Sequence, residues 1–121
     1  MSKVMIVDDE NDIVELIRFV LERDGHQVFS AKNGKEALEK VVDVNPDLII
    51  SDIMMPEMDG YTMNTRLQAM DETRSIPVII LTAKGQMRDL FVLGSNVVSF
   101  MEKPFDPKGL REKIKEILNT K

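Results

Sequence analysis

The chain contains no cysteine, so disulfide frameworks and thiolate metal sites are excluded and a reducing compartment is compatible with the sequence. No apolar run approaches the roughly 20 residues that a membrane-spanning helix needs, and the first residues do not resemble a signal peptide. The net charge of -5 opposes nonspecific binding to nucleic acid, which needs clustered lysine and arginine. We therefore expect a cytoplasmic protein, not bound to a membrane, that reaches DNA only through a partner or another domain.

Short apolar runs alternate with amphipathic stretches along the chain. At 121 residues the length suits one domain, and we expect residues 1–121 to form it. Strands are predicted at residues 3–7, 27–31, 48–50, 76–81 and 97–101. Helices are predicted from a cap at Asn11 or Asp12 to Gly25, after the Asn33-Gly34 turn with Ala37, Leu38, Val41 and Val42 toward the core, at 60–70, at 85–95, and from Pro107 to Leu118. This alternation predicts an α/β fold, a parallel sheet with helices on both faces.

Polar side chains follow four of the five predicted strands. Asp8 and Asp9 end the first strand, Asp52 the third, Thr82 the fourth and Lys103 the fifth. In open parallel sheets, ligands bind at the carboxyl ends of the strands. The four polar strand ends can form one such site only if those four strands are neighbours. The sequence therefore predicts a flavodoxin-like, doubly wound five-stranded sheet of order 2-1-3-4-5, with the second strand at an edge.

The converging groups are three carboxylates, a lysine and a hydroxyl. Carboxylates held about 4 Å apart repel by roughly 4 kcal/mol per pair at an effective dielectric near 20, so a cation is expected among them. The set contains neither histidine nor cysteine, which favours a hard ion such as Mg²⁺. With Lys103 and Thr82 beside it, Asp52 is the expected nucleophile of a phosphoryl transfer.

Four motifs resemble the receiver domain of two-component response regulators, in the same order and over essentially the whole chain. They are DDE at residues 8–10, SDIMMPEMDG at 51–60, LTA at 81–83 and KPF at 103–105. The resemblance implies that Asp52 accepts a phosphoryl group from the phosphohistidine of a histidine kinase or a phosphotransfer protein. It implies a phosphoacceptor signalling domain rather than an enzyme, although one that assists its own phosphorylation and dephosphorylation.

The resemblance also implies a metal site. Asp9, Asp52 and the backbone carbonyl of Met54 are expected to bind Mg²⁺ directly, and Asp8 through a water molecule. Thr82 is expected to contact the phosphoryl oxygens. These roles come from the matching motif positions and not from the spacing of the residues.

Four further expectations follow from the same likeness. Lys103 contacts the phosphoryl oxygens and precedes a cis peptide bond to Pro104, while Phe100 occupies the position of the switch aromatic residue that rotates as Thr82 moves. Phosphorylation is expected to change the surface formed by residues 85–95, the fifth strand and the last helix, which signals to a partner or an output domain. On the residues alone, Phe100 is better interpreted as a core side chain than as a switch, and only the resemblance favours the switch role.

The segment before the fifth strand departs from the common receiver pattern. Many receivers carry Gly-Ala where this chain has Asn96-Val97, and Asn96 is a residue type that tolerates the left-handed conformation at a helix end. Consecutive apolar residues at 91–93 exceed what one inward stripe needs. We therefore expect either a monomer or a phosphorylation-dependent dimer.

Three other functions are compatible with parts of the pattern. A haloacid-dehalogenase-like phosphatase also uses an aspartate nucleophile with Mg²⁺, but carries an Asp-x-Asp pair on one strand, whereas the tight pair here is Asp8-Asp9. A flavodoxin-type cofactor binder would have an acidic turn where its phosphate loop belongs. A pseudo-receiver that binds partners without phosphorylation is disfavoured, because every site residue is present.

Overall fold

The computed structural model describes residues 2–52, 60–83, 96–103 and 106–119. They form β1 (Lys3–Val7), α1 (Asn11–Arg23), β2 (Gln27–Ala31), α2 (Gly34–Val44), β3 (Leu48–Asp52), α3 (Gly60–Ala69), β4 (Val78–Ala83), β5 (Val97–Lys103) and α4 (Pro107–Asn119). The helix predicted at 85–95 lies outside the described residues. Among those described, no helix has the length and apolar character needed to span a membrane.

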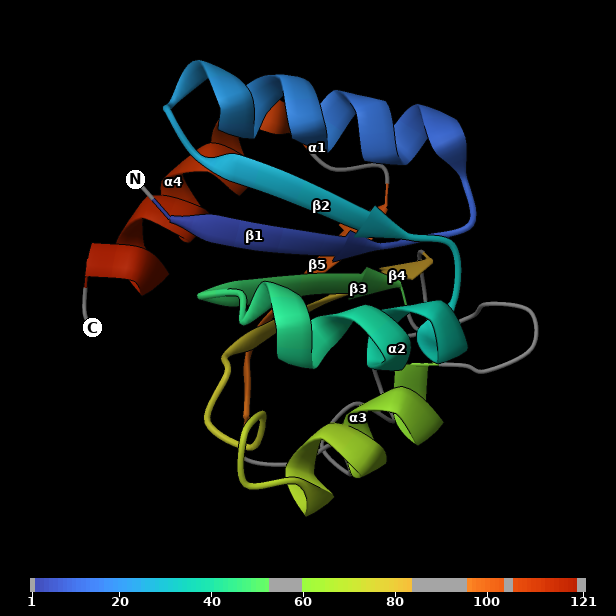
Figure 1. Cartoon of the computed structure of the whole chain (residues 1–121). Coiled ribbons are helices and arrows are strands. Elements are labelled where there is room, and N and C mark those ends of the chain that lie inside the picture. The colour runs from blue at the N-terminus through green and yellow to red at the C-terminus, as the bar shows by residue number, and fades with distance from the viewer. Residues whose placement is uncertain (1, 53–59, 84–95, 104–105, 120–121) are drawn as a thin grey trace.

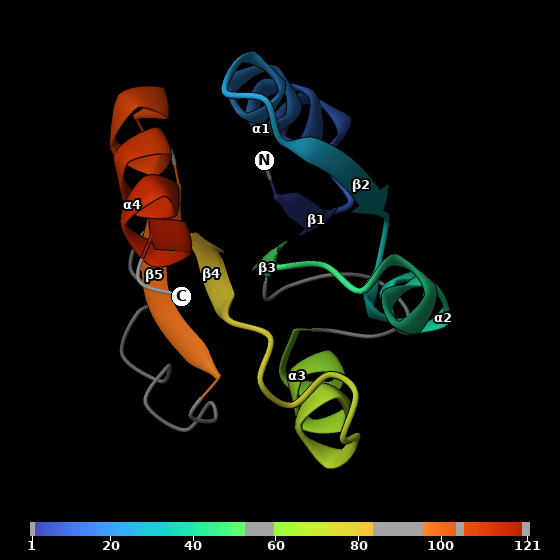
Figure 2. The ribbon, with the colours of Figure 1, turned by 60° about the vertical axis from the view of Figure 1, so that its left-hand side comes forward.

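The five strands form one parallel sheet in the order β2-β1-β3-β4-β5, as the sequence predicted. Helices α1 and α4 cover one face of this sheet, and α2 and α3 cover the other (Figures 1 and 2). β3 lies at the centre, paired with β1 and β4, and all five of its residues are buried. The fold is therefore a doubly wound sheet whose middle strand ends in Asp52.

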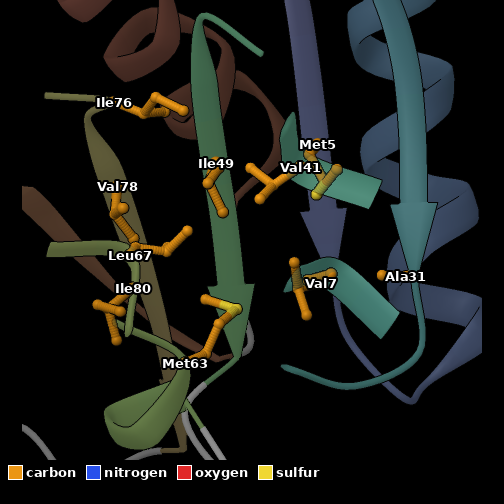
Figure 3. Close-up of a cluster of buried hydrophobic side chains, with 11 residues drawn as sticks. Met5, Val7, Ala31, Val41, Ile49, Met63, Leu67, Ile76, Val78 and Ile80 are labelled. Carbon is orange, nitrogen blue, oxygen red and sulfur yellow. The ribbon is translucent and has the colours of Figure 1, made fainter. Parts of the chain in front are cut away.

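The strands supply both cores because successive side chains of a strand point to opposite faces. On β1, Val4 and Ile6 pack toward α1 and α4, whereas Met5 and Val7 pack toward α2 and α3. The second core is shown in Figure 3 and consists of Met5, Val7, Ala31, Ala37, Val41, Ile49, Met63, Leu67, Ile76, Val78 and Ile80. Two apolar faces hold the sheet between helices, so the strand ends are fixed relative to one another.

Turn residues set where the helices begin and end. Asn33 caps α2, because its Oδ1 accepts a hydrogen bond from the backbone N–H of Glu36 at 2.8 Å. Gly25 follows α1 with a φ of 88°, a left-handed conformation that glycine adopts without a Cβ clash. Asn45 ends α2 with a φ of 49°, the left-handed conformation that asparagine tolerates at a helix end. The helix that Asn96 was expected to follow lies outside the described residues.

Several local predictions need correction. The N-cap of α1 is Glu10 rather than Asn11 or Asp12, and the Glu10 side chain makes no capping bond. Val42, predicted to face the core, is 48% exposed because it lies on the outer edge of the α2 stripe. β4 begins at Val78 and not at residue 76, and β4 and β5 extend through Ala83 and Lys103. Thr82 and Lys103 therefore lie within the last residues of their strands.

Candidate functional site

The carboxyl ends of β1, β3 and β5 bring charged side chains together. Asp8 follows β1, Asp52 is the last residue of β3, and Lys103 is the last residue of β5. Asp8 is 2% exposed and Asp52 is 6% exposed, so both carboxylates are withdrawn from bulk water. Burial of a charge is costly unless another charge or a hydrogen bond offsets it, and the site supplies both.

Asp8 is fixed by backbone and side-chain hydrogen bonds. Its N–H donates to the carbonyl of Ala31 at 3.1 Å, which continues the pairing of β1 with β2 by one residue. Its Oδ1 accepts from the backbone N–H of Glu10 at 2.9 Å, and its Oδ2 accepts from Lys103 Nζ at 3.1 Å. The turn after β1 therefore directs this carboxylate across the sheet edge toward β5.

Lys103 joins the three acidic positions. Its Nζ donates to Asp8 Oδ2 at 3.1 Å, to Asp52 Oδ2 at 3.1 Å and to Glu10 Oε1 at 2.9 Å. Burial opposes the charged ammonium, but the hydrogen bonds to Glu10, Asp8 and Asp52 outweigh it and raise the pKa of Lys103 above its ordinary value. Lys103 is therefore a fixed positive charge beside Asp52.

One lysine does not neutralise the site. Asp8, Asp9, Glu10 and Asp52 offer carboxylate oxygens that all lie within 4.8 Å of one another. Burial raises the pKa of Asp8, and the Asp52 charge adds to that effect, although hydrogen bonds from the Glu10 N–H and from Lys103 act against it. An all-oxygen set with surplus negative charge fits a hard divalent cation such as Mg²⁺.

The structure brings together Asp8, Asp9, Asp52 and Lys103, four of the predicted site residues. Thr82 is fully buried on the neighbouring strand and follows Leu81, whose Cα pairs in register with Asp52. Its backbone position is thus one residue beyond that of Asp52 along the sheet edge.

Phe100 pairs in register with Ile80 and packs, partly buried, against the core on the α2 and α3 side. Its observed position is therefore a core position. The predicted Met54 ligand and the Lys103-Pro104 peptide bond lie outside the described residues.

Glu10 belongs to the site, and the sequence interpretation gave it no role beyond the turn. The Lys103 ammonium has three hydrogens, and Asp8 and Asp52 account for two of its acceptors. The presence of a third carboxylate in the turn after β1 was the sequence feature that could have indicated this additional acceptor for Lys103. A pattern read along each strand alone does not show that Glu10 reaches a lysine 93 residues away.

Comparisons with known proteins agree with this geometry. Residues 4–115 match the family described as the response regulator receiver domain. The chain is 39% identical over 119 residues to the alkaline phosphatase synthesis transcriptional regulatory protein PhoP of Bacillus subtilis (strain 168), covering 97% of this chain and 48% of PhoP. It is 36% identical over 118 residues to the transcriptional regulatory protein SrrA of Staphylococcus aureus (strain NCTC 8325 / PS 47), with 97% and 48% covered.

Two solved structures extend the comparison. The signal receiver domain of a signal transduction histidine kinase from Syntrophus aciditrophicus superposes with a TM-score of 0.90 at 35% identity, covering 99% of this chain and 92% of that one. The chemotaxis response regulator CheY4 of Vibrio cholerae gives 0.87 at 27% identity, covering 97% and 98%. The chain spans about half the length of the curated relatives it matches, 48% for both PhoP and SrrA. It belongs to the response regulator receiver domain family of two-component signalling proteins.

Proposed function

We propose that Asp52 accepts a phosphoryl group from the phosphohistidine of a histidine kinase or phosphotransfer protein. The observation that carries this proposal is the environment of the Asp52 carboxylate. It ends the central strand, is 6% exposed, and has the Lys103 ammonium 3.1 Å from Oδ2 with the Asp8 and Asp9 carboxylates beside it. Asp52 is thus a nucleophile with a fixed cation and a candidate metal site at its oxygens.

The same residues support Mg²⁺ as the cofactor. Receiver domains bind Mg²⁺ at an acidic pocket, and this chain has such a cluster. In our proposal Asp9, Asp52 and the Met54 carbonyl hold the ion and Asp8 holds it through water. When bound, the ion supplies positive charge that offsets the repulsion among the carboxylates and the incoming phosphoryl group.

The proposed transfer uses the geometry around Asp52. An Asp52 carboxylate oxygen forms a bond to phosphorus while the bond from phosphorus to the donor imidazole nitrogen breaks, and the departing imidazole takes up a proton. Lys103 and the Thr82 hydroxyl donate hydrogen bonds to the equatorial phosphoryl oxygens, which carry the charge of the transition state. The group that remains is an aspartyl phosphate on this signalling domain.

We further propose that residues 1–121 form one receiver domain that switches between two states. Movement of Thr82 toward the phosphoryl group lets Phe100 rotate, which changes the surface of residues 85–95, β5 and α4. The partner is an output protein or an output domain. PhoP and SrrA are named as transcriptional regulators and are about twice as long as this chain, so an attached or separate DNA-binding output in the cytoplasm fits the proposal.

Intact mass after incubation with Mg²⁺ and acetyl phosphate tests the proposal. We expect the wild type and the control variant Asp43→Asn, altered at an exposed position of α2, to gain one phosphoryl group. Asp52→Asn and wild type in EDTA should gain none. A phosphoryl group on Asp52→Asn, or none on wild type that binds Mg²⁺ by calorimetry, would contradict it. Rapid multiple-turnover hydrolysis of simple phosphate esters would instead indicate a phosphatase.

A further inference from the structure

The three acceptors of Lys103 differ in their exposure. The side chains of Asp8 and Asp52 are 0% and 9% exposed, whereas the Glu10 side chain is 59% exposed. An ammonium group has three hydrogens, and the three carboxylates take one each. In this state Lys103 has no remaining hydrogen for a phosphoryl oxygen.

The backbone directs Glu10 toward this contact. Glu10 is the N-cap residue of α1 in an extended conformation, with φ -96° and ψ 109°, and its N–H is held by Asp8 Oδ1 at 2.9 Å. An N-cap side chain ordinarily accepts a hydrogen bond from the first turn of its own helix. The Glu10 side chain makes no such bond, and its Oε1 lies 2.9 Å from Lys103 Nζ.

Phosphoryl transfer requires one of the three hydrogen bonds to be given up. Release of Asp8 or Asp52 would leave a buried carboxylate without this cation, which is strongly unfavourable. Release of Glu10 moves an exposed carboxylate into water, and an exposed ion pair changes an equilibrium constant by only about one- to fivefold. Glu10 is therefore the acceptor that Lys103 loses most easily.

We propose that Glu10 is a positioning residue, which holds the third hydrogen of Lys103 in the resting site and surrenders it to the incoming phosphoryl group. The inference rests on the proposed phosphorylation of Asp52. Glu10 then competes with the phosphodonor for the same hydrogen of Lys103. The apparent affinity for the phosphodonor is lowered, because sites in which Glu10 accepts this hydrogen bond are not ready to bind it. The plateau rate is unaffected, because Glu10 is already displaced once the donor is bound.

Phosphorylation rates over a range of acetyl phosphate concentrations, at saturating Mg²⁺, test this competition. We expect Glu10→Gln to lower the half-saturating concentration about two- to fivefold without raising the plateau, because a neutral amide is a weaker acceptor for an ammonium. The control is Asp12→Asn, which removes the same charge from the exposed first turn of α1.

Equal behaviour of Glu10→Gln and Asp12→Asn would overturn the inference.

A second measurement needs neither metal nor phosphodonor. Thermal unfolding in EDTA is compared for wild type, Glu10→Gln, Lys103→Met and the double variant, which isolates the coupling of the two side chains. We expect the Tm change caused by Glu10→Gln to be more negative with Lys103 present than with methionine there. Equal changes in both backgrounds would overturn the inference. Phosphorylation of wild type but not of Asp52→Asn would show at the same time that the proposed function stands.

Discussion

Asp8→Asn should raise the free energy of unfolding of the metal-free protein while weakening the binding of Mg²⁺ at the site. The variant removes a charge from a side chain that is 0% exposed and keeps an oxygen of nearly the same shape. That oxygen can still accept the hydrogen bond that the Glu10 N–H now donates to Oδ1. Lys103 keeps Asp52 and Glu10 as acceptors, so no buried cation is left unpaired.

The size of the effect follows from opposing electrostatic contributions. The attraction between Asp8 and Lys103 at 3.1 Å is about 5 kcal/mol at an effective dielectric of 20. The repulsion between Asp8 and Asp52, at no more than 4.8 Å, is about 3.5 kcal/mol or more on the same scale. Desolvation of a buried carboxylate costs several kcal/mol further, so the loss of the charge is favourable by about 1 to 2 kcal/mol.

Thermal and urea unfolding in EDTA near neutral pH provide the assay, with Asp43→Asn as the control for net charge. A gain of about 1 to 2 kcal/mol corresponds to a Tm higher by about 4 to 10 °C for a domain of this size. Mg²⁺ should then raise the Tm of wild type more than that of Asp8→Asn, because a ligand stabilises the state that binds it.

The pH dependence has a defined sign. Burial raises the pKa of Asp8 above its ordinary value of 3.8, so the folded state takes up a proton at higher pH than the unfolded chain. The free-energy cost of burying the Asp8 charge is complete above the pKa of Asp8 in the folded state, and it disappears as the pH falls toward 3.8. The advantage of Asp8→Asn should shrink in the same way. A variant less stable than wild type at neutral pH, or a stability advantage unchanged in acid, would show that burial of the Asp8 charge does not destabilise the fold.

Three further results are expected. Ile50 is fully buried in β3, so Ile50→Ala should lower the free energy of unfolding measured in urea by about 2 to 5 kcal/mol, and Ile50→Val by about 0.5 to 1.5 kcal/mol. Equal losses for the two variants would contradict close packing at this position. Burial lowers the pKa of His26, whose Nδ1 accepts a hydrogen bond from the Ser2 N–H at 3.2 Å. The free energy of unfolding should therefore fall as the pH drops below about 6.5, because the unfolded chain then binds a proton that the folded state resists. His26→Gln should remove this pH dependence. Arg18 and Lys40 donate hydrogen bonds to the carbonyls of Val28 and Ser30, which lie on the side of β2 that faces away from β1. Replacing Arg18 and Lys40 together with methionine should expose this strand edge and produce strand-paired dimers in size-exclusion chromatography. A double variant that stays monomeric would contradict this.

The polar strand ends made the sheet order predictable from sequence. Asp8, Asp52, Thr82 and Lys103 had to converge, and only a sheet with β2 at one edge brings their four strands together. The apolar periodicities of α1 and α4 were likewise sufficient to predict both helices, and residues on their apolar faces, such as Ile17 and Leu110, are fully buried. These features depend on local pattern and on the geometry common to all parallel sheets.

Contacts between distant side chains were not predictable in the same way. Asn64 and Asn96 are both buried, and their amides exchange hydrogen bonds of 2.6 and 3.2 Å across 32 positions of sequence. An asparagine on a helix ordinarily indicates the solvent side, so the pattern of α3 alone gave no sign of this pair. The contact between Glu10 and Lys103 depends on the direction of a long side chain at a helix start, which no periodicity specifies.

Asp52 is the residue proposed to carry the phosphoryl group, and its modification can be located directly. The direct measurement is reduction of the protein with sodium borohydride after incubation with Mg²⁺ and acetyl phosphate, which converts a phosphorylated aspartate to homoserine, followed by peptide mass spectrometry. We expect conversion at Asp52 and at neither Asp8 nor Asp9. Conversion at Asp8 or Asp9, or at no aspartate in protein that binds Mg²⁺, would contradict it.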